Sequence, residues 1–91
     1  MKATVIKPNG AVLEIEKVRH EAELEWMQRT VGGYIEIITL NKDQVLVINE
    51  EGKLEGLDYN KTATSIFHKN LGHNTDYIAG TAILMNKKYL R

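Results

Sequence analysis

Residues 34–49 read YIEIITLNKDQVLVIN, which is the pattern of two strands joined by a short polar turn. Isoleucines alternate with a glutamate in residues 34–40, which predicts a strand with one apolar face. The polar residues 41–43 predict a turn into a second strand at residues 44–49. Because residues 45–48 are all apolar, we expect both faces of this second strand to be covered and the strand to lie centrally in the sheet.

A further hairpin and a helix are predicted upstream. Residues 3–7 and 11–17 have strand character, and the Pro-Asn-Gly sequence at residues 8–10 predicts the turn between them. The apolar period then changes, and residues 19–31 are predicted to form a helix that ends at the glycine pair 32–33. Three apolar residues recur at helical spacing and are expected to form its buried stripe: Leu24, Met27 and Val31.

Downstream, the sequence predicts an extended segment, a second helix and a last strand. Residues 53–57 are expected to be extended, and Asn60 is expected to cap a helix at residues 61–69. Residues 77–85 have strand character, and Gly80 within them indicates a bulge or a close approach by another backbone.

The element order is therefore ββαββαβ, which indicates an α+β fold in a single domain over residues 1–91. Hairpins enforce antiparallel neighbours, so we expect a mostly antiparallel sheet with the helices on one face, in a β-grasp-like arrangement. An edge strand, either in the first hairpin or at the end of the chain, could pair across a twofold axis. A homodimer is the expected assembly.

Composition excludes several classes of protein. The chain has 12 Lys and Arg against 12 Asp and Glu, a net charge of zero, so an all-over phosphate-binding surface is not expected. It has no cysteine, which excludes disulfides, thiolate metal sites and thiol nucleophiles. The sequence begins without an export signal and has no apolar run long enough to cross a bilayer. We therefore expect a cytoplasmic protein with no membrane partner.

No catalytic constellation is recognisable. The three histidines, His20, His68 and His73, include no pair spaced by four residues for a metal on one helical face. The single serine, Ser65, lacks the Gly-x-Ser-x-Gly elbow of acyl-transfer enzymes. The sequence thus predicts a non-enzymatic protein without catalytic residues, metal or cofactor.

Trp26 is the candidate anchor of a protein-binding surface. On a helical wheel it lies about 100° from Met27, toward the edge or outside of the helix. Tryptophan is enriched at binding hot spots, although it could also fold over the edge of its own helix. The same segment carries three carboxylates that could steer a partner electrostatically: Glu21, Glu23 and Glu25.

The sequence leaves two other kinds of ligand as alternatives to a protein partner: a small nucleotide and a nucleic acid. Asn49, Glu50 and Asn60 could provide polar contacts to a small nucleotide signal, as an alternative to helix capping by Asn60. Residues 1–51 hold six basic and nine acidic residues, and residues 52–91 hold six basic and three acidic ones. The basic end contains only Tyr89 as an interleaved aromatic residue, so a nucleic-acid-associated role ranks last.

Four segments of the chain in combination resemble a known family: VGGYIE at 31–36, VINEEGKL at 47–54, Asn60, and IAGTA at 78–82. They are similar to small proteins of bacteriophages, plasmids and conjugative elements that are grouped as a domain of unknown function, and the resemblance extends over residues 1–85. It implies a cytoplasmic protein that binds a host protein, as a counter-defence inhibitor would. The family pattern supplies no catalytic residues, and Trp26 departs from it.

Overall fold

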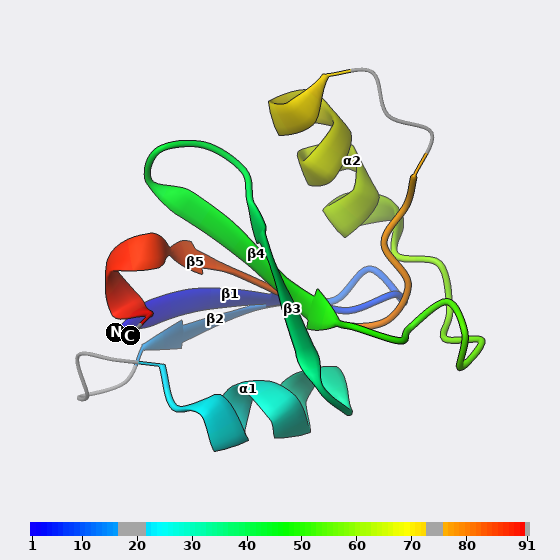
Figure 1. Ribbon diagram of the computed structural model, residues 1–91, viewed down its shortest axis with the longest axis horizontal. Helices are drawn as coiled ribbons and strands as arrows, with labels where there is room; N and C mark the ends of the chain where they lie inside the picture. The colour runs from blue at the N-terminus through cyan, green and yellow to red at the C-terminus, as the bar shows by residue number, and fades with distance from the viewer. Residues whose placement is uncertain (17–21, 73–75, 91) are drawn as a thin grey trace.

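The sheet of this protein has five antiparallel strands in the order β2-β1-β5-β4-β3 (Figure 1). The structure is a computed structural model that describes residues 1–16, 22–72 and 76–90. Its strands are Lys2–Ile6 (β1), Val12–Glu16 (β2), Ile35–Thr39 (β3), Gln44–Asn49 (β4) and Ala82–Asn86 (β5). Its helices are Leu24–Val31 (α1), Lys61–Leu71 (α2) and the short 3-10 helix Lys87–Tyr89 (η1). The predicted α+β class and the order ββαββαβ are confirmed.

The last strand, β5, lies in the middle of the sheet. Its Ile83 is paired with Val5 of β1 on one side and with Val47 of β4 on the other. The sheet edges are β2 and β3, so the last strand is not an edge that could pair across a twofold axis, and β4 is second from an edge rather than central. A β-grasp arrangement is absent, because that fold places its first and last strands in parallel and here they are antiparallel.

Strand β4 is covered on both faces, as predicted. Val45 and Val47 point to one side and belong to a buried cluster with residues of α1, whereas Leu46 and Ile48 point to the other side and belong to a cluster with residues of α2. Successive side chains of a strand alternate between its faces, so an uninterrupted apolar run needs a covering layer on each side.

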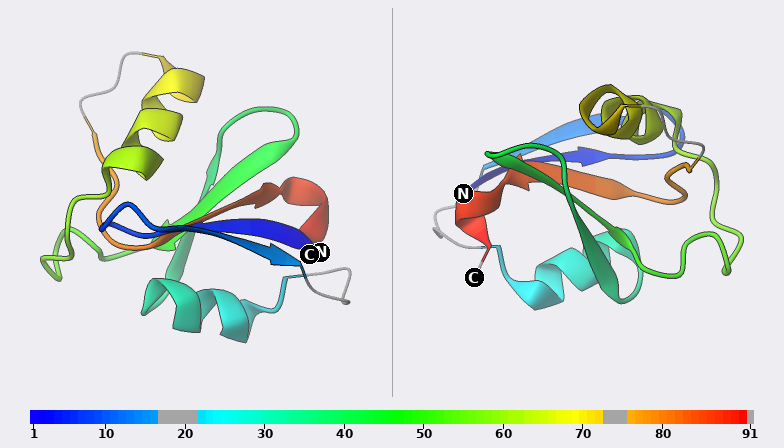
Figure 2. Two further views of the ribbon diagram at one scale, coloured as in Figure 1. Left: turned by 180° about the vertical axis from the view of Figure 1, so that it is seen from behind. Right: turned by 45° about the horizontal axis from the view of Figure 1, so that its top comes forward.

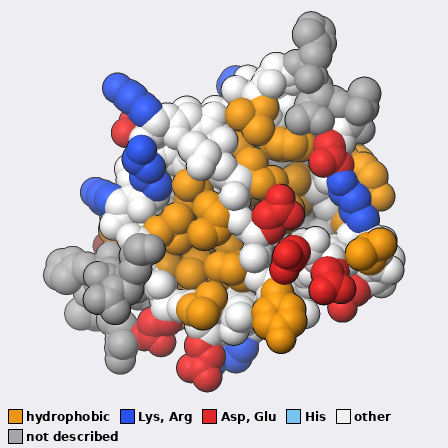
Figure 3. All heavy atoms as spheres, viewed as in Figure 1, with side chains coloured by type: hydrophobic (Ala, Val, Ile, Leu, Met, Phe, Trp, Pro, Cys, Tyr) orange, Lys and Arg blue, Asp and Glu red, His pale blue; other side chains and the backbone are white. Residues whose placement is uncertain are grey.

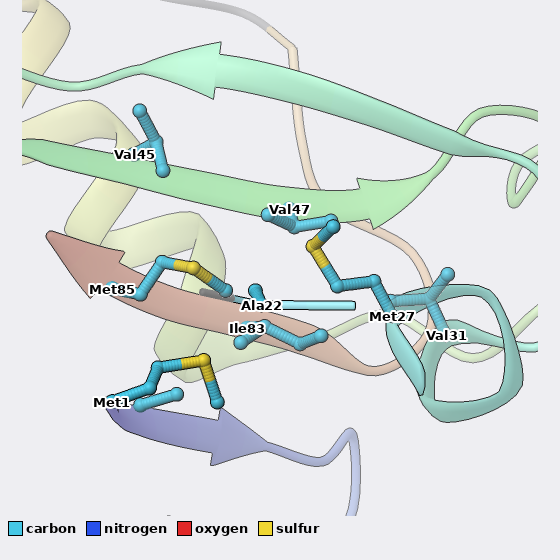
Figure 4. Close-up of a cluster of buried hydrophobic side chains, with 9 residues drawn as sticks. Met1, Ala22, Met27, Val31, Val45, Val47, Ile83 and Met85 are labelled. Atoms are coloured by element: carbon cyan, nitrogen blue, oxygen red, sulfur yellow. The ribbon is translucent and has the colours of Figure 1, made fainter. Parts of the chain in front are cut away.

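The two helices lie on opposite faces of the sheet, so the expectation of helices on one face is wrong (Figure 2). Met27 and Val31 of α1 pack beside Val47 and Ile83 (Figure 4). The buried residues of α2 are Ala63, Thr64 and Phe67. The physical reason is the sheet itself, which carries apolar side chains on both faces of β4 and β5 and cannot bury them under one layer.

Helix α1 is shorter than predicted. Residues 17–21 lie outside the described residues, and Ala22 and Glu23 are not helical, so the described helix begins at Leu24. It ends at Gly32, as predicted. Leu24 is 56% exposed and does not belong to the buried stripe.

Trp26 is half-buried and packs against the α1-side cluster, together with Tyr89 and Leu90. The sequence left open whether it faces solvent or folds over the edge of its helix, and in the structure the large indole reaches the cluster from the flank of the helix. The alternative considered for it, packing over the edge of the helix, fits the structure better.

The chain between β4 and β5 also differs in part from the prediction. Residues 50–56 form consecutive turns, so the extended segment expected at 53–57 is wrong. Helix α2 is two residues longer than predicted, and residues 77–81 precede β5 with only an isolated bridge between Tyr59 and Ala79. Another backbone does lie close to Gly80, because its N–H donates to the Asp58 carbonyl at 2.7 Å, and the Leu57 side chain lies beside it as well.

No helix in the described part of the chain is long and apolar enough to cross a membrane.

Candidate functional site

The segment that follows β4 folds back on itself at one end of the sheet. The Glu55 N–H donates to the Glu51 carbonyl at 2.9 Å, and the Leu57 N–H donates to the Gly52 carbonyl at 2.9 Å. The Glu50 N–H donates to the Tyr34 carbonyl at 2.8 Å, which ties the start of the segment to the residue before β3. The turns therefore hold several glutamates and Tyr34 at one place.

Asn49, the last residue of β4, fastens this segment to the core. Its side chain is buried, and its Nδ2 donates to the Val31 carbonyl and to Glu55 Oε1, each at 3.2 Å. Its Oδ1 accepts the Glu51 N–H at 2.8 Å. Asn49 thus fixes the C-terminal end of α1, the Glu55 carboxylate and the turn after β4 relative to one another.

A hollow of about 340 Å³, which we name the acidic pocket, opens beside Asn49. Its lining residues are Gln28, Gly33, Tyr34, Asn49, Glu51 and Glu55. Tyr34 is 70% exposed, so its ring is accessible at the pocket. The pocket combines an aromatic ring, an amide held in place and two carboxylates.

A second hollow of about 260 Å³ adjoins the first, because both are lined by Asn49 and Glu51. The Lys53 ammonium lies in ion-pair contact with Asp76 and 4.8 Å from the centre of the Tyr77 ring. Tyr59 stacks on Tyr77 with ring centres 5.7 Å apart. A cation is therefore held between a carboxylate and an aromatic ring within this chain.

We name the lining of the two hollows the acidic face. It presents five carboxylates and one lysine: Glu36, Glu50, Glu51, Glu55, Asp76 and Lys53. Exposed aromatic and apolar side chains lie among them: Tyr34, Leu54 and Tyr77. Figure 3 shows acidic and hydrophobic side chains interspersed over the end of β4 and the segment that follows it. The face is strongly negative although the chain as a whole is neutral.

Gly52→Ala is expected to disturb the acidic face through its backbone. A Cβ at residue 52 would lie 2.6 Å from the Ala79 carbonyl oxygen, so one of the two segments must move. Overpacking of this kind costs about 1–3 kcal/mol of unfolding free energy. Urea denaturation followed by circular dichroism measures it, with Leu54→Ala, at a residue that is 87% exposed, as the control. A Gly52→Ala protein as stable as the control would contradict this packing.

The structure separates the three polar residues predicted to bind a small ligand. Asn49 and Glu50 both line the second hollow. Asn60 is completely buried, and its Nδ2 donates to the carbonyls of Ile6 and Gly80, each at 2.9 Å, while its Oδ1 accepts the Ala63 N–H at 3.0 Å. The ligand-binding role for Asn60 is therefore wrong, and its alternative role as the cap of α2 is confirmed.

The residues predicted to bind a partner protein lie around α1. Glu23 and Glu25 are exposed at the start of the helix, and Trp26 is packed against the core beside them. Glu21 lies outside the described residues. None of the described three lines either hollow, so they do not share a site with Asn49 and Glu50.

Sequence reasoning missed Tyr34, Glu55 and Asp76 as members of the site. Tyr34 precedes β3, Glu55 lies in a turn, and Asp76 precedes β5, so only the folded chain brings them together. The density of glutamates at residues 50–55 was the available signal.

No three His, Asp or Glu side chains of the described residues converge in a way that could hold a metal ion. The acidic face thus offers charge and aromatic surface, and its carboxylates are spread along two hollows.

A family model described as a domain of unknown function (DUF3846) matches residues 1–89. The chain belongs to this family. No curated protein and no solved structure matches the chain significantly. Membership in DUF3846 agrees with the resemblance found in the sequence and assigns no activity to the chain.

Proposed function

We propose that this DUF3846 protein is a non-enzymatic binding protein that attaches to a basic surface of a host protein through its acidic face. The observation that carries the proposal is the combination of five carboxylates with exposed aromatic and apolar side chains around two adjoining hollows.

Both components of the face suit a protein interface. Leu54 is 87% exposed and Tyr34 is 70% exposed, and such side chains bury apolar area when a partner covers them. Tyrosine is also enriched at binding hot spots. The carboxylates would steer a positively charged partner and reject a negatively charged one. The face therefore selects its partner by charge and binds it through its rings.

The same charges disfavour the other ligands considered. A nucleotide phosphate placed in either hollow would meet Glu51 and further carboxylates, and Lys53, the one cation among the described lining residues, already pairs with Asp76. A nucleic-acid backbone would be repelled in the same way. A nucleotide-binding or nucleic-acid-binding role for this face is therefore less favourable than binding to a basic protein.

The finer proposal is that binding blocks the host protein, as a counter-defence inhibitor acting in the host cytoplasm would. Its support is the resemblance to small proteins of phages and plasmids, together with a small chain that can cover a functional surface. A homodimer through the β2 edge is compatible with this proposal, because β2 lies at the opposite edge of the sheet from β3.

A pair of charge-inverted triple variants tests the proposal. Glu36→Lys/Glu50→Lys/Glu51→Lys inverts the acidic face, whereas Glu16→Lys/Glu25→Lys/Asp43→Lys changes the net charge equally at exposed positions elsewhere. We expect the wild-type protein and the second variant to capture the same host protein from lysate of the cell that naturally contains them. The first variant should bind it at least about 100-fold more weakly, since like charges across an interface cost several kcal/mol.

The Kd of the purified pair, measured by calorimetry at two salt concentrations, gives the quantitative comparison. Wild-type affinity should fall as salt rises, because salt screens exposed charges. Equal affinity of the two triple variants for the captured protein, or no capture by the wild type, would contradict the proposed function.

A further inference from the structure

The acidic pocket has the components that recognise a single cationic side chain, and this inference rests on the proposed function and deepens it. We propose that the pocket receives an arginine side chain of the partner protein, with the guanidinium stacked on Tyr34 and hydrogen-bonded to Glu55.

The Glu55 carboxylate is held in position before any partner arrives. Asn49 Nδ2 donates to Glu55 Oε1 at 3.2 Å, and Asn49 is itself buried and anchored to the Val31 carbonyl. No donor of the described residues bonds to Glu55 Oε2, which is left to accept from a ligand. A carboxylate fixed through one oxygen loses little side-chain freedom on binding, which favours affinity.

The backbone that carries the aromatic wall of the pocket is also anchored. The Tyr34 carbonyl accepts the Glu50 N–H, so the backbone of Tyr34 is fixed while 70% of the residue stays exposed. Cations lie favourably over the face of an aromatic ring, and the planar guanidinium can stack on the ring while its N–H groups reach a carboxylate. A lysine ammonium cannot make the planar contact.

The neighbouring hollow shows within the chain that a cation fits between an aromatic ring and a carboxylate. Lys53 there lies over the Tyr77 ring and pairs with Asp76. The acidic pocket has a ring and two carboxylates in a comparable set, Tyr34 with Glu51 and Glu55, and no cation of the described residues pairs with either glutamate. Its volume of about 340 Å³ leaves room for a side chain from outside.

The test uses N-acetyl-arginine amide as the probe and ¹⁵N-correlated NMR of the full chain as the readout. We expect saturable shifts of the Asn49 side-chain amide and the Gly33 N–H, with a Kd on the order of 1 mM for so small a ligand. The citrulline analogue has nearly the same shape without the charge, and should bind at least about tenfold more weakly, because charged hydrogen bonds are the stronger ones. The lysine analogue should also bind more weakly.

Matched variants connect the shifts to the pocket. Glu55→Gln and Tyr34→Leu should each weaken arginine binding about tenfold or more, whereas Glu25→Gln on α1 should leave it unchanged. Shifts of equal size with citrulline or lysine, or shifts that survive Glu55→Gln, would overturn the arginine assignment, as would a lack of any shift.

This failure is distinguishable from failure of the proposed function. If the arginine probe does not bind but inversion of the acidic face still abolishes capture of the host protein, the pocket assignment alone is wrong. If the probe binds in the pocket but inversion of the face leaves capture unchanged, the proposed function is wrong.

Discussion

Leu46→Ala is expected to lower the free energy of unfolding by about 3–5 kcal/mol. Leu46 is completely buried in β4, where it is paired with Ile38 of β3 and Leu84 of β5 and belongs to the cluster beneath α2. Truncation removes its buried apolar atoms and leaves a cavity between the sheet and the helix. Urea denaturation followed by circular dichroism measures the change.

Leu54→Ala is the matched control, because it makes the same chemical change at a residue that is 87% exposed. Its effect should stay within about 0.5 kcal/mol. If the two variants lose similar stability, Leu46 does not lie between the sheet and α2. If Leu46→Ala is too unstable to measure, Leu46→Val offers a smaller truncation with the same expected direction.

Asn60→Ala is expected to destabilise the protein by about 3 kcal/mol or more, since it removes a helix cap and the side-chain donor to two buried carbonyls. The Asn60 side chain joins three elements: it donates to Ile6 at the end of β1 and to Gly80 before β5, and it caps α2 at Ala63. The measurement is again the free energy of unfolding in urea.

Asn60→Asp separates these roles. Aspartate is as good a cap as asparagine, but it cannot donate to the two carbonyls and adds a buried charge. We therefore expect Asn60→Asp to be destabilised at least as much as Asn60→Ala. The control Lys61→Ala at the adjacent exposed position should have little effect. Near wild-type stability of Asn60→Asp would show that only the cap matters.

The strands and the cap of α2 could be predicted because their signals are local. Alternation in residues 34–40, the apolar run at residues 45–48 and the asparagine before residue 61 each act within a few positions of the chain. The strand order could not be predicted in the same way. Insertion of β5 between β1 and β4 depends on contacts between distant segments, to which periodicity is insensitive.

The placement of the helices shows a second limit. The apolar run in β4 indicates two covered faces, but it does not say which element covers each. On α1, the helical wheel counts only the direction of each Cα–Cβ bond. The length of the Trp26 side chain allows it to reach the core, while Leu24 at the first helical position stays exposed. Side-chain size therefore decides between the two orientations that the sequence left open for Trp26.

Only part of the acidic face could be predicted from the sequence. Asn49 and Glu50 were predicted as contacts, and both lie there. The proposed function gives them a different role, because the surrounding carboxylates would favour a cation over a nucleotide phosphate. Tyr34 lies at the site because of the register of β3 with β4, and Asp76 lies there because of the turns before β5. No local pattern in the sequence predicts that these residues are close together.

Hydrogen–deuterium exchange of the protein alone and in complex with its captured host protein tests directly whether the acidic face is the binding surface. Binding through the acidic face predicts slowed exchange at residues 49–58 and at 34–36, with exchange unchanged at residues 24–27 of α1, which precede the pocket residue Gln28. Slowed exchange at residues 24–27, with residues 49–58 unaffected, would contradict binding through the acidic face. The binding surface would then lie on the helix that carries Trp26.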